Sequence, residues 1–437
     1  MLRLNVEKLR QEIEACDGFR IAGKLRSANG LLTCTLPAAV GEQCEIVTSE
    51  GCLLAEVIGF TDGLAHLVAY DEVVDVKPGM SVIGTGRRLA VPVGEGLLGR
   101  VLDGLGRPID GNGPLDECEL RAVCHDVPPA LDRARIGEPF VTGQRAIDGL
   151  LTCGRGQRVG IFSGSGVGKS TLLGEIAKGS SGDVNVIALI GERGRELRPF
   201  LDDCLGAAGR ARSVVMVATC EQPALLRVRA AQAAITMAEH FRSEGAHVVF
   251  LLDSLTRLAM AQRELGLVLG EPPSSRGYTP SVFQLMATTL ERLGNAAQGS
   301  ITGIVTVLVE GDDLDEPISD AARALLDGHI VLDRRLAERG HYPAVSVAQS
   351  ISRVSREVTG PSHQSAARKL KAILATYGEV EDLIRIGAYV KGSSPPVDRA
   401  VELLPAVNAF LRQEVGEKTS FEETRAGMER IAAAWPF

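Results

Sequence analysis

Residues 163–171, Ser-Gly-Ser-Gly-Val-Gly-Lys-Ser-Thr, lie between an apolar stretch (QRVGIF) and a helical one (TLLGEIAKG). Glycines let successive backbone N–H groups surround phosphate oxygens, and the N-terminus of the following helix adds partial positive charge. In such a loop Lys169 reaches the β- and γ-phosphates, and the Ser170 hydroxyl binds Mg²⁺. Ser163 replaces the first glycine of the pattern G-x-x-x-x-G-K-[ST], and a residue this small is expected to fit. We therefore predict a phosphate-binding loop, not an unliganded glycine-rich turn, made of Gly164, Ser165, Gly166, Val167, Gly168, Lys169, Ser170 and Thr171.

Two carboxylates follow later strand-like runs. VNVIALI precedes GERGRE (residues 191–196), and HVVFLL precedes Asp253. Because ligands of open α/β sheets lie outside the carboxyl ends of the strands, both carboxylates should face the phosphate loop. Glu192 can orient and polarise an attacking water, and Asp253 can hold Mg²⁺ through its water shell. The alternatives are a solvated loop charge at Glu192 and a helix cap at Asp253.

Arg353 lies just beyond the last predicted strand, in the segment GHYPAVSVAQSISRVSREV. A side chain at this position can project across a subunit boundary, where an arginine stabilises the charge of phosphoryl transfer. Most arginines are simply surface residues, so residue type and position alone leave both interpretations open.

After about residue 20, three different sequence patterns divide the chain into three regions. From about 20 to 90, short apolar runs are split by Gly, Asp and Pro, which predicts a small β-barrel at 19–92. From about 145 to 350, apolar runs alternate with helical stretches, which predicts an α/β domain at 93–358 whose parallel sheet is buried on both faces. Helical periodicity then predicts a C-terminal helical domain at 359–437.

Composition narrows the class of protein. The 437 residues carry a net charge of −8. Because sequence-independent binding of nucleic acid usually needs a basic surface, this charge argues mildly against it. Nine cysteines without a C-x-x-C pair favour a reducing cytosol over a secreted disulfide framework. No apolar run approaches the roughly 20 residues that span a bilayer, so we expect a cytoplasmic protein that, if it acts at a membrane, associates with it peripherally from the cytoplasmic side. Residues 1–18 show helical spacing, either for packing on their own domain or for binding a partner.

Four segments resemble the rotary ATP synthase catalytic-subunit superfamily: GRVLDGLGRPIDG, TGQRAIDGLLTCGRGQRVGIFSGSGVGKST, ALIGERGRE and LLDSLTRLAMAQRELGLVLGEPPSSRGYTPSVF. Within it, EGDDLDEPISDAARALLDGHIVLDRRLAERGHYPAV and GERGRE are similar to the export ATPases of flagellar and type III secretion systems. The resemblance covers nearly the whole chain from about residue 20. It implies an α/β protein with a RecA-like P-loop core, an N-terminal β-barrel, a C-terminal helical domain and a homohexameric assembly.

The resemblance also implies roles for individual residues. ATP and Mg²⁺ would be the ligands, and Glu192 would be the catalytic carboxylate, with Lys169, Arg193 and Arg257 on the phosphate side. Asp253 would serve with Ser170 at the metal. Tyr342 would stack on adenine, and Arg353 would be an arginine finger.

One expectation comes from the chain's own residues. Glu192 and Arg353 occur in the same polypeptide, so identical copies can complete one another's sites in a closed ring.

The function that the resemblance implies is ATP hydrolysis that energises protein export, with chaperone release and substrate unfolding at an export gate. A flagellar apparatus is the first expectation and a virulence-type injectisome the second. The other candidates are a proton-coupled rotary synthase subunit, an RNA-translocating hexameric helicase and a non-catalytic nucleotide-binding scaffold. The few aromatic residues of the barrel region argue against the helicase.

The implied partners follow from that function. We expect a stator-like regulatory protein at the helix of residues 1–18 and a stalk-like coiled-coil protein at the helical domain. Export-gate membrane proteins and chaperone–substrate complexes are expected as well, with no nucleic acid. The expected location is the cytoplasm, peripherally at the cytoplasmic face of the inner membrane.

Overall fold

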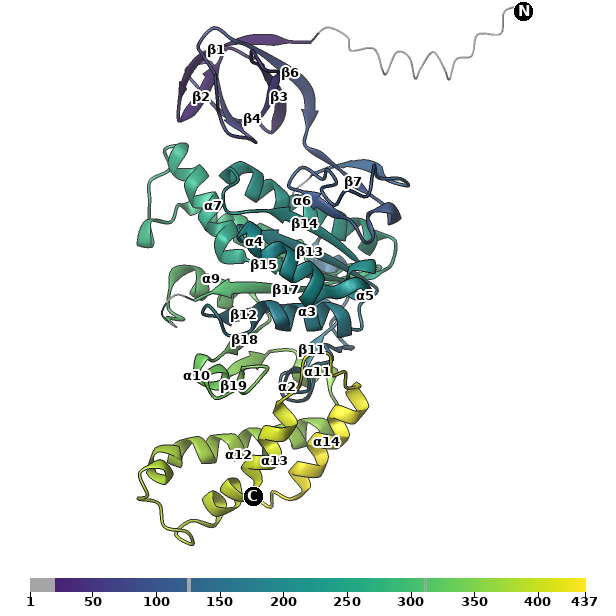
Figure 1. Ribbon diagram of the computed structural model, residues 1–437, viewed down its shortest axis with the longest axis vertical. Helices are drawn as coiled ribbons and strands as arrows, with labels where there is room; N and C mark the ends of the chain where they lie inside the picture. The colour runs from purple at the N-terminus through teal and green to yellow at the C-terminus, as the bar shows by residue number, and fades with distance from the viewer. Residues whose placement is uncertain (1–19, 124–126, 310, 312) are drawn as a thin grey trace, which may run out of the picture. The chain divides into compact units, whose positions relative to one another are not determined.

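A computed structural model describes residues 20–123, 127–309, 311 and 313–437 (Figure 1). The helix predicted for residues 1–18 lies outside these ranges. The described chain forms two compact units. One comprises residues 20–90 with Val268–Gly270, and the other comprises Val91–Leu267 with Glu271–Phe437.

The first unit is a closed six-stranded barrel with strand order β1-β2-β5-β4-β3-β6, which confirms the predicted barrel. Its strands are β1 (Ala22–Asn29), β2 (Leu31–Cys34), β3 (Glu42–Val47), β4 (Cys52–Thr61), β5 (Leu64–Ala69) and β6 (Ser81–Arg88). Every second residue of β5 is buried, so Ala65, Leu67 and Ala69 face the barrel interior. Residues 73–80, which precede β6 and include three valines, do not form a strand, because Asp75 and Gly79 adopt positive φ angles that interrupt an extended conformation.

The second unit is built on a nine-stranded sheet with order β19-β18-β12-β17-β15-β13-β14-β8, and β16 pairs with β17. Its strands are β8 (Val101–Asp103), β12 (Arg158–Ser163), β13 (Val184–Ile190), β14 (Ser213–Ala218), β15 (His247–Asp253), β16 (Gly294–Asn295), β17 (Ser300–Leu308), β18 (Gly328–Leu332) and β19 (Val345–Ser352). Neighbouring strands are parallel except β18–β19 and β16–β17. All residues of β14 and β15 are buried, as expected for a sheet covered on both faces.

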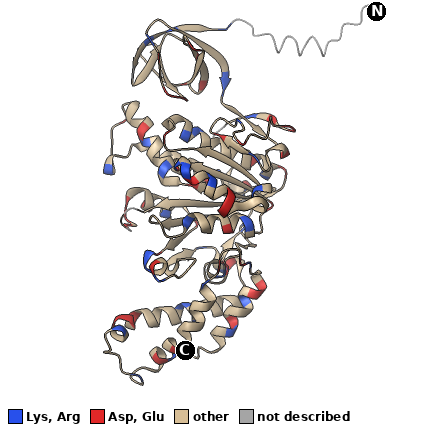
Figure 2. Cartoon of the chain, viewed as in Figure 1, with Lys and Arg blue, Asp and Glu red and all other residues tan. Residues whose placement is uncertain are grey.

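Helices connect these strands and cover the sheet. They are α2 (Arg145–Leu150), α3 (Lys169–Gly179), α4 (Gly194–Pro199), α5 (Gly206–Ala211), α6 (Ala224–Ser243), α7 (Leu255–Val268), α8 (Pro280–Glu291), α9 (Pro317–Leu325), α10 (Arg334–Glu338) and α11 (Ser355–Val358). Two small sheets, β7 (Ala90–Val93) with β9 (Glu119–Ala122) and β10 (Pro139–Phe140) with β11 (Cys153–Gly154), lie outside the main one. Charged residues lie mostly on helices and loops, whereas the central strands carry few (Figure 2).

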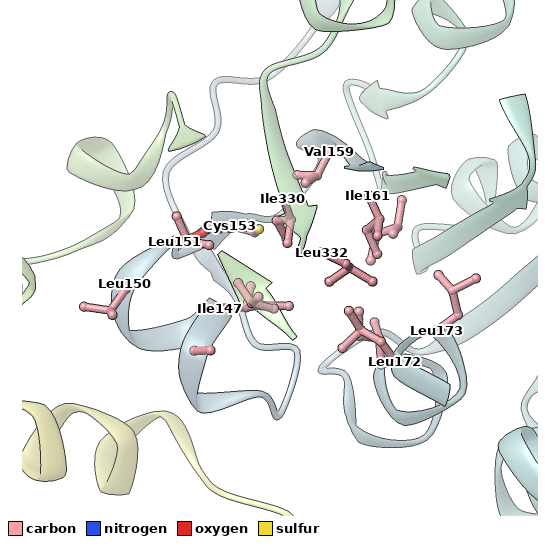
Figure 3. Close-up of a cluster of buried hydrophobic side chains, with 14 of the residues drawn as sticks. Ile147, Leu150, Leu151, Cys153, Val159, Ile161, Leu172, Leu173, Ile330 and Leu332 are labelled. Carbon is pink, nitrogen blue, oxygen red and sulfur yellow. Dashed lines mark hydrogen bonds between the residues drawn. The ribbon is translucent and has the colours of Figure 1, made fainter. Parts of the chain in front are cut away.

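A hydrophobic cluster anchors the elements that flank the phosphate loop (Figure 3). Ile147 of α2, Ile161 of β12, Leu172 of α3 and Ile330 of β18 are all buried in it. Because side chains before and after residues 163–169 share this core, both ends of the loop are held by close packing.

The C-terminal helical domain contains α12 (Pro361–Arg385), α13 (Pro395–Leu411) and α14 (Phe421–Ala433), and it packs on α2 (Figure 1). The RecA-like core with a barrel and a helical domain is thereby confirmed. Helix α13 ends at Leu411, although apolar residues recur at helical spacing in the sequence as far as Val415. Gln413 explains the early end, because its backbone N–H donates to Tyr342 O at 2.9 Å, outside the helix. Among the described residues, no helix is long and apolar enough to cross a membrane.

Candidate active site

The phosphate loop joins the end of β12 to the start of α3. Gly166 has φ 78° and Gly168 has φ 88°, a left-handed conformation that glycine adopts without strain. Ser163 ends β12 and is buried, and its φ is not positive, so a non-glycine residue fits there without backbone strain. The loop geometry therefore accepts the one departure from the sequence pattern.

Lys169, Glu192 and Asp253 come together at the carboxyl edge of the sheet. Lys169 Nζ lies 2.5 Å from Asp253 Oδ1 and 3.6 Å from Glu192 Oε1. Thr306 of β17, the strand between β12 and β15, donates a hydrogen bond of 2.6 Å to Asp253 Oδ1. Asp253 is thus held by the loop lysine and by a neighbouring strand, and its carboxylate faces the phosphate loop.

Glu192 is a partly buried carboxylate with an unused acceptor. Its buried Oε1 also lies 3.7 Å from Arg257 Nε, and it accepts no hydrogen bond from any residue that the structure describes. Burial and the nearby Asp253 carboxylate raise the pKa of Glu192, while the Lys169 and Arg257 cations lower it. A carboxylate with a free lone pair and a raised pKa is suited to accept a proton from water.

A small pocket of about 20 Å³ is lined by Ser170, Glu192, Arg193 and Asp253 among others. That volume is enough for about one water molecule. Arg193 precedes α4, is largely exposed, and lies 3.7 Å from Glu196. A hydroxyl, two carboxylates and a guanidinium therefore border space for about one water molecule, together with the apolar side chains of Leu189, Leu197, Phe200 and Val217.

Gly191 allows Arg257 to approach Glu192. A Cβ at Gly191, whose φ is 71°, would lie 2.9 Å from the Cβ of Arg257. The contact explains why the residue before Glu192 is glycine, a reason that the sequence pattern alone did not supply.

The oxygen donors fit Mg²⁺. Ser170 offers a hydroxyl and Asp253 a carboxylate, and Mg²⁺ prefers oxygen ligands, often one or two from the protein together with substrate phosphates. Within residues 20–123, 127–309, 311 and 313–437, no group of three or more His, Cys, Asp or Glu residues could hold a metal ion. A site that relies on two protein oxygens and the phosphates is the arrangement these residues permit.

Tyr342 lies on the other side of the phosphate loop, at a pocket of about 340 Å³. Its ring is 46% exposed, and a Cβ at Gly168 would lie 3.5 Å from two ring carbons. Thr171 lines the same pocket, as do residues 413–415, a segment of the helical domain. An exposed aromatic ring offers a flat apolar face on which a base can stack.

Sequence reasoning missed the contribution of residues 413–415 to this pocket. The segment reads Gln-Glu-Val, has no phosphate-binding or aromatic signature, and lies more than 240 residues after the phosphate loop. Only the packing of the helical domain on α2 brings it there, so no local signal could have identified it.

Arg353 does not approach the other predicted residues in its own chain. Ser352 pairs with Gly328 at the amino end of β18, whereas the phosphate loop follows the carboxyl end of the parallel strand β12. The six residues of β12 span about 17 Å. The Arg353 backbone N–H donates to Asp327 O, and its Nη2 donates to Arg323 O at 3.1 Å. Arg353 therefore lies near the amino end of β18, whereas Lys169 follows the carboxyl end of the parallel strand β12.

Comparison with known families divides the chain in the same way as its fold. Residues 34–86 match the β-barrel domain of the ATP synthase alpha/beta family, and residues 143–352 match that family's nucleotide-binding domain. Residues 359–430 match the C-terminal domain of the type III secretion system ATPase EscN.

Individual relatives match over nearly the full chain. The flagellum-specific ATP synthase of Bacillus subtilis (strain 168) is 47% identical, over 96% of this chain and 97% of its own length. The type 3 secretion system ATPase of Pseudomonas syringae pv. tomato is 46% identical, over 95% of both chains. The solved structure of the assembled ATPase EscN in complex with its central stalk EscO, from enteropathogenic E. coli, is 42% identical with a TM-score of 0.87. That match covers 94% of this chain and 100% of EscN.

Barrel, core and helical domain all match one kind of protein, and identities exceed 40% over almost the entire length. The chain is an ATPase that belongs to the ATP synthase alpha/beta family and, within it, to the type III secretion and flagellum-specific ATPases.

Proposed function

We propose that the chain hydrolyses ATP at sites shared between neighbouring copies in a homohexameric ring, and so energises protein export through a flagellar type III apparatus. One observation carries the shared site. Lys169, Glu192 and Asp253 converge at one edge of the sheet, whereas Arg353 lies at the other. A phosphate loop and an arginine at opposite edges can meet when copies of the chain associate head to tail in a closed ring.

At the phosphate side, Lys169 and the loop N–H groups bind the phosphates, and Glu192 orients the attacking water and accepts its proton. Ser170 and Asp253 would hold Mg²⁺, which supplies charge neutralisation at the phosphate oxygens when bound. Arg193 and Arg257 flank Glu192 and add positive charge where negative charge develops. At the other end, Tyr342 stacks on adenine.

Mixed rings test the shared site. Glu192→Gln and Arg353→Ala each remove one half of a site, so a ring made of either variant alone has a defect at every interface. In a mixed ring, some interfaces pair an intact Glu192 with an intact Arg353, and we expect part of the ATPase activity to return. Mixing Glu192→Gln with Lys169→Ala is the matched control, because both changes lie on the same side of the interface. Mixed rings as inactive as either variant alone would contradict a shared site.

The concentration dependence of activity gives a second test. A site completed by a neighbour predicts that ATPase rate per chain rises with protein concentration as rings form. A rate per chain that stays constant over the range in which light scattering detects assembly would argue for a complete site in each monomer.

The flagellar assignment is separate from the ATPase chemistry, because flagellar and injectisome relatives have nearly equal identity to this chain. Genes for flagellar structural proteins beside this one would support it, whereas injectisome genes would favour the virulence-type system. The functional test deletes the gene and complements it with the wild-type chain or with Lys169→Ala. We expect motility to be lost and to return only with the wild type, and normal motility in the deletion strain would contradict the flagellar assignment.

The proposed partners follow from export. Residues 1–18 would bind a stator-like regulatory protein, and pull-down with a chain lacking them should lose that partner. The helical domain would contact a stalk-like coiled coil, in keeping with the stalk complex of EscN. Crosslinks confined to the barrel would contradict that placement. Export-gate proteins and chaperone–substrate complexes complete the set, and we propose a peripheral location at the cytoplasmic face of the inner membrane.

A further inference from the structure

Arg145, the first residue of α2, joins the α/β core to the segment that follows α13. Its Nε donates a hydrogen bond of 2.8 Å to Phe410 O, and its Nη2 donates to Arg412 O. Its Nη1 donates to the Glu417 carboxylate and, at 3.2 Å, to Thr419 Oγ1. One guanidinium thus binds both ends of residues 410–419, and a planar fork of five donors is the group best suited to do so.

Gln413 makes a second attachment within the same segment. Its Oε1 accepts a 2.9 Å bond from the Arg145 N–H, and its Nε2 donates to Gly143 O and Glu417 O, both at 2.7 Å. Its own backbone N–H donates to Tyr342 O at 2.9 Å. Gln413 is buried and every donor and acceptor of its side chain is used, so it ties Tyr342 and α2 to the helical domain.

A third attachment reaches the phosphate-loop helix. The Gly416 N–H donates a 2.9 Å bond to Glu175 Oε2, and Glu175 lies in α3 less than two turns after Lys169. Residues 413–415 between these attachments line the pocket beside Tyr342. Arg145 is not among the residues that line this pocket.

We propose that Arg145 is a positioning residue for the base-binding pocket: it holds residues 412–417 of the helical domain against Tyr342 and so sets the affinity for the base. The inference rests on the proposed function, which assigns the nucleotide base to this pocket. The Arg145 side chain makes its contacts through a charged donor, and each such hydrogen bond contributes more than a bond between neutral groups. Loss of the Arg145 side chain removes one of the three attachments that hold residues 412–417 and so loosens this segment, while the phosphate loop keeps its own anchors in β12 and α3.

A comparison of two ligands separates this role from a general loss of structure. ADP uses both the phosphate side and the base pocket, whereas inorganic tripolyphosphate, with Mg²⁺, uses the phosphate side alone. For Arg145→Ala we expect the Kd of ADP to rise by roughly tenfold, which corresponds to the free energy of about one hydrogen bond from a charged donor. The Kd of tripolyphosphate should stay within about twofold of the wild-type value. ATPase kinetics should show a raised KM with a nearly unchanged kcat at saturating ATP.

Milder variants keep the experiment decisive if Arg145→Ala folds poorly. Arg145→Lys keeps the positive charge but replaces the planar fork with a single ammonium group, so its ADP affinity should lie between those of wild type and Arg145→Ala. Glu417→Gln should weaken ADP binding less than either Arg145 variant. The matched control is Arg399→Ala. Arg399 also binds a backbone carbonyl and a carboxylate, those of Ala434 and Glu402, but both lie inside the helical domain.

The outcomes are distinct. A selective loss of ADP affinity that Arg145→Lys partly restores and Arg399→Ala does not reproduce supports the proposal. Equal losses for ADP and tripolyphosphate, or no change for ADP, overturn it. Binding of both ligands to the wild-type protein should be lost in Lys169→Ala. If it is not, or if wild type binds neither ligand, the assignment of the nucleotide site is itself wrong, and the inference fails with it.

Discussion

The two ends of the proposed nucleotide site are built in different ways. The phosphate end gathers Lys169, Glu192 and Asp253, each at or shortly after the end of a strand of one parallel sheet, and its distances are set by sheet geometry. The base end gathers Tyr342, Gln144 at the N-cap of α2, and residues 413–415, which three separate segments supply and hydrogen bonds tie together. Chemistry therefore depends on a rigid sheet, whereas base affinity depends on how the helical domain is held. Changes at the two ends should separate rate from affinity.

The largest effect is expected at the phosphate end. Glu192→Gln removes the proton acceptor but keeps the shape and size of the side chain. We expect kcat to fall by about a thousandfold, within the usual range for loss of a general base. ADP affinity should remain within about threefold, since the substitution leaves the loop and the base pocket in place. Single-turnover ATP hydrolysis and ADP titration by calorimetry give the two numbers.

The control for that variant is Glu381→Gln. Glu381 is a partly exposed glutamate of α12 that pairs with Arg339 at 2.8 Å, so its replacement should leave kcat unchanged. A similar fall in both variants, or a large loss of ADP affinity in Glu192→Gln alone, would break the separation between chemistry and binding.

A smaller and opposite pattern is expected at the base end. Tyr342→Ala removes the stacking platform, which contributes about 1–3 kcal/mol per base, so the Kd of ADP should rise by roughly fivefold to a hundredfold. Tyr342→Phe keeps the ring and should retain most of the affinity. The value of kcat at saturating ATP should change little in either variant. A fall in kcat without a change in KM would mean that the two ends are not separable.

The pH dependence of hydrolysis sharpens the description of the phosphate end. Burial and Asp253 raise the pKa of Glu192, so the rate should fall with decreasing pH at a higher pH than for an ordinary glutamate. Arg257 lowers this pKa, and Arg257→Gln should therefore move the acidic limb to higher pH. Arg399 binds Ala434 O and Glu402 within the helical domain, so Arg399→Gln serves as the control and should leave the limb in place. Single-turnover rates against pH provide the measurement, and an unmoved limb in Arg257→Gln would contradict the assignment.

The same contrast explains what sequence alone could predict. Lys169, Glu192 and Asp253 each follow an apolar strand within a few residues, and parallel strands place their carboxyl ends at one edge, so local patterns were sufficient. The barrel likewise followed from short apolar runs split by Gly, Asp and Pro, and the helical domain followed from helical periodicity. The base pocket had no such signal, because Gln413 and Arg145 are 268 positions apart and meet only through packing of the helical domain. The end of α13 has no local signal for the same reason: the apolar pattern continues to Val415, but the Gln413 backbone N–H bonds Tyr342 O outside the helix.

Ser163 should give the smallest effect, and it tests how strictly the phosphate end is defined. Its φ is not left-handed, so glycine offers no relief of strain, and its buried Oγ has no hydrogen-bond partner within the described chain. Ser163→Ala removes that unpaired hydroxyl and should stabilise the protein by about 1 kcal/mol. Ser163→Gly removes it too but adds backbone freedom to the unfolded chain, which costs about 0.5–1 kcal/mol, so its stability should nearly equal that of wild type. Thermal or urea unfolding measures both, and ATPase activity should stay within about twofold because the loop N–H groups are unchanged. A large gain of activity in Ser163→Gly would show that the phosphate loop is strained by its serine, contrary to the backbone geometry.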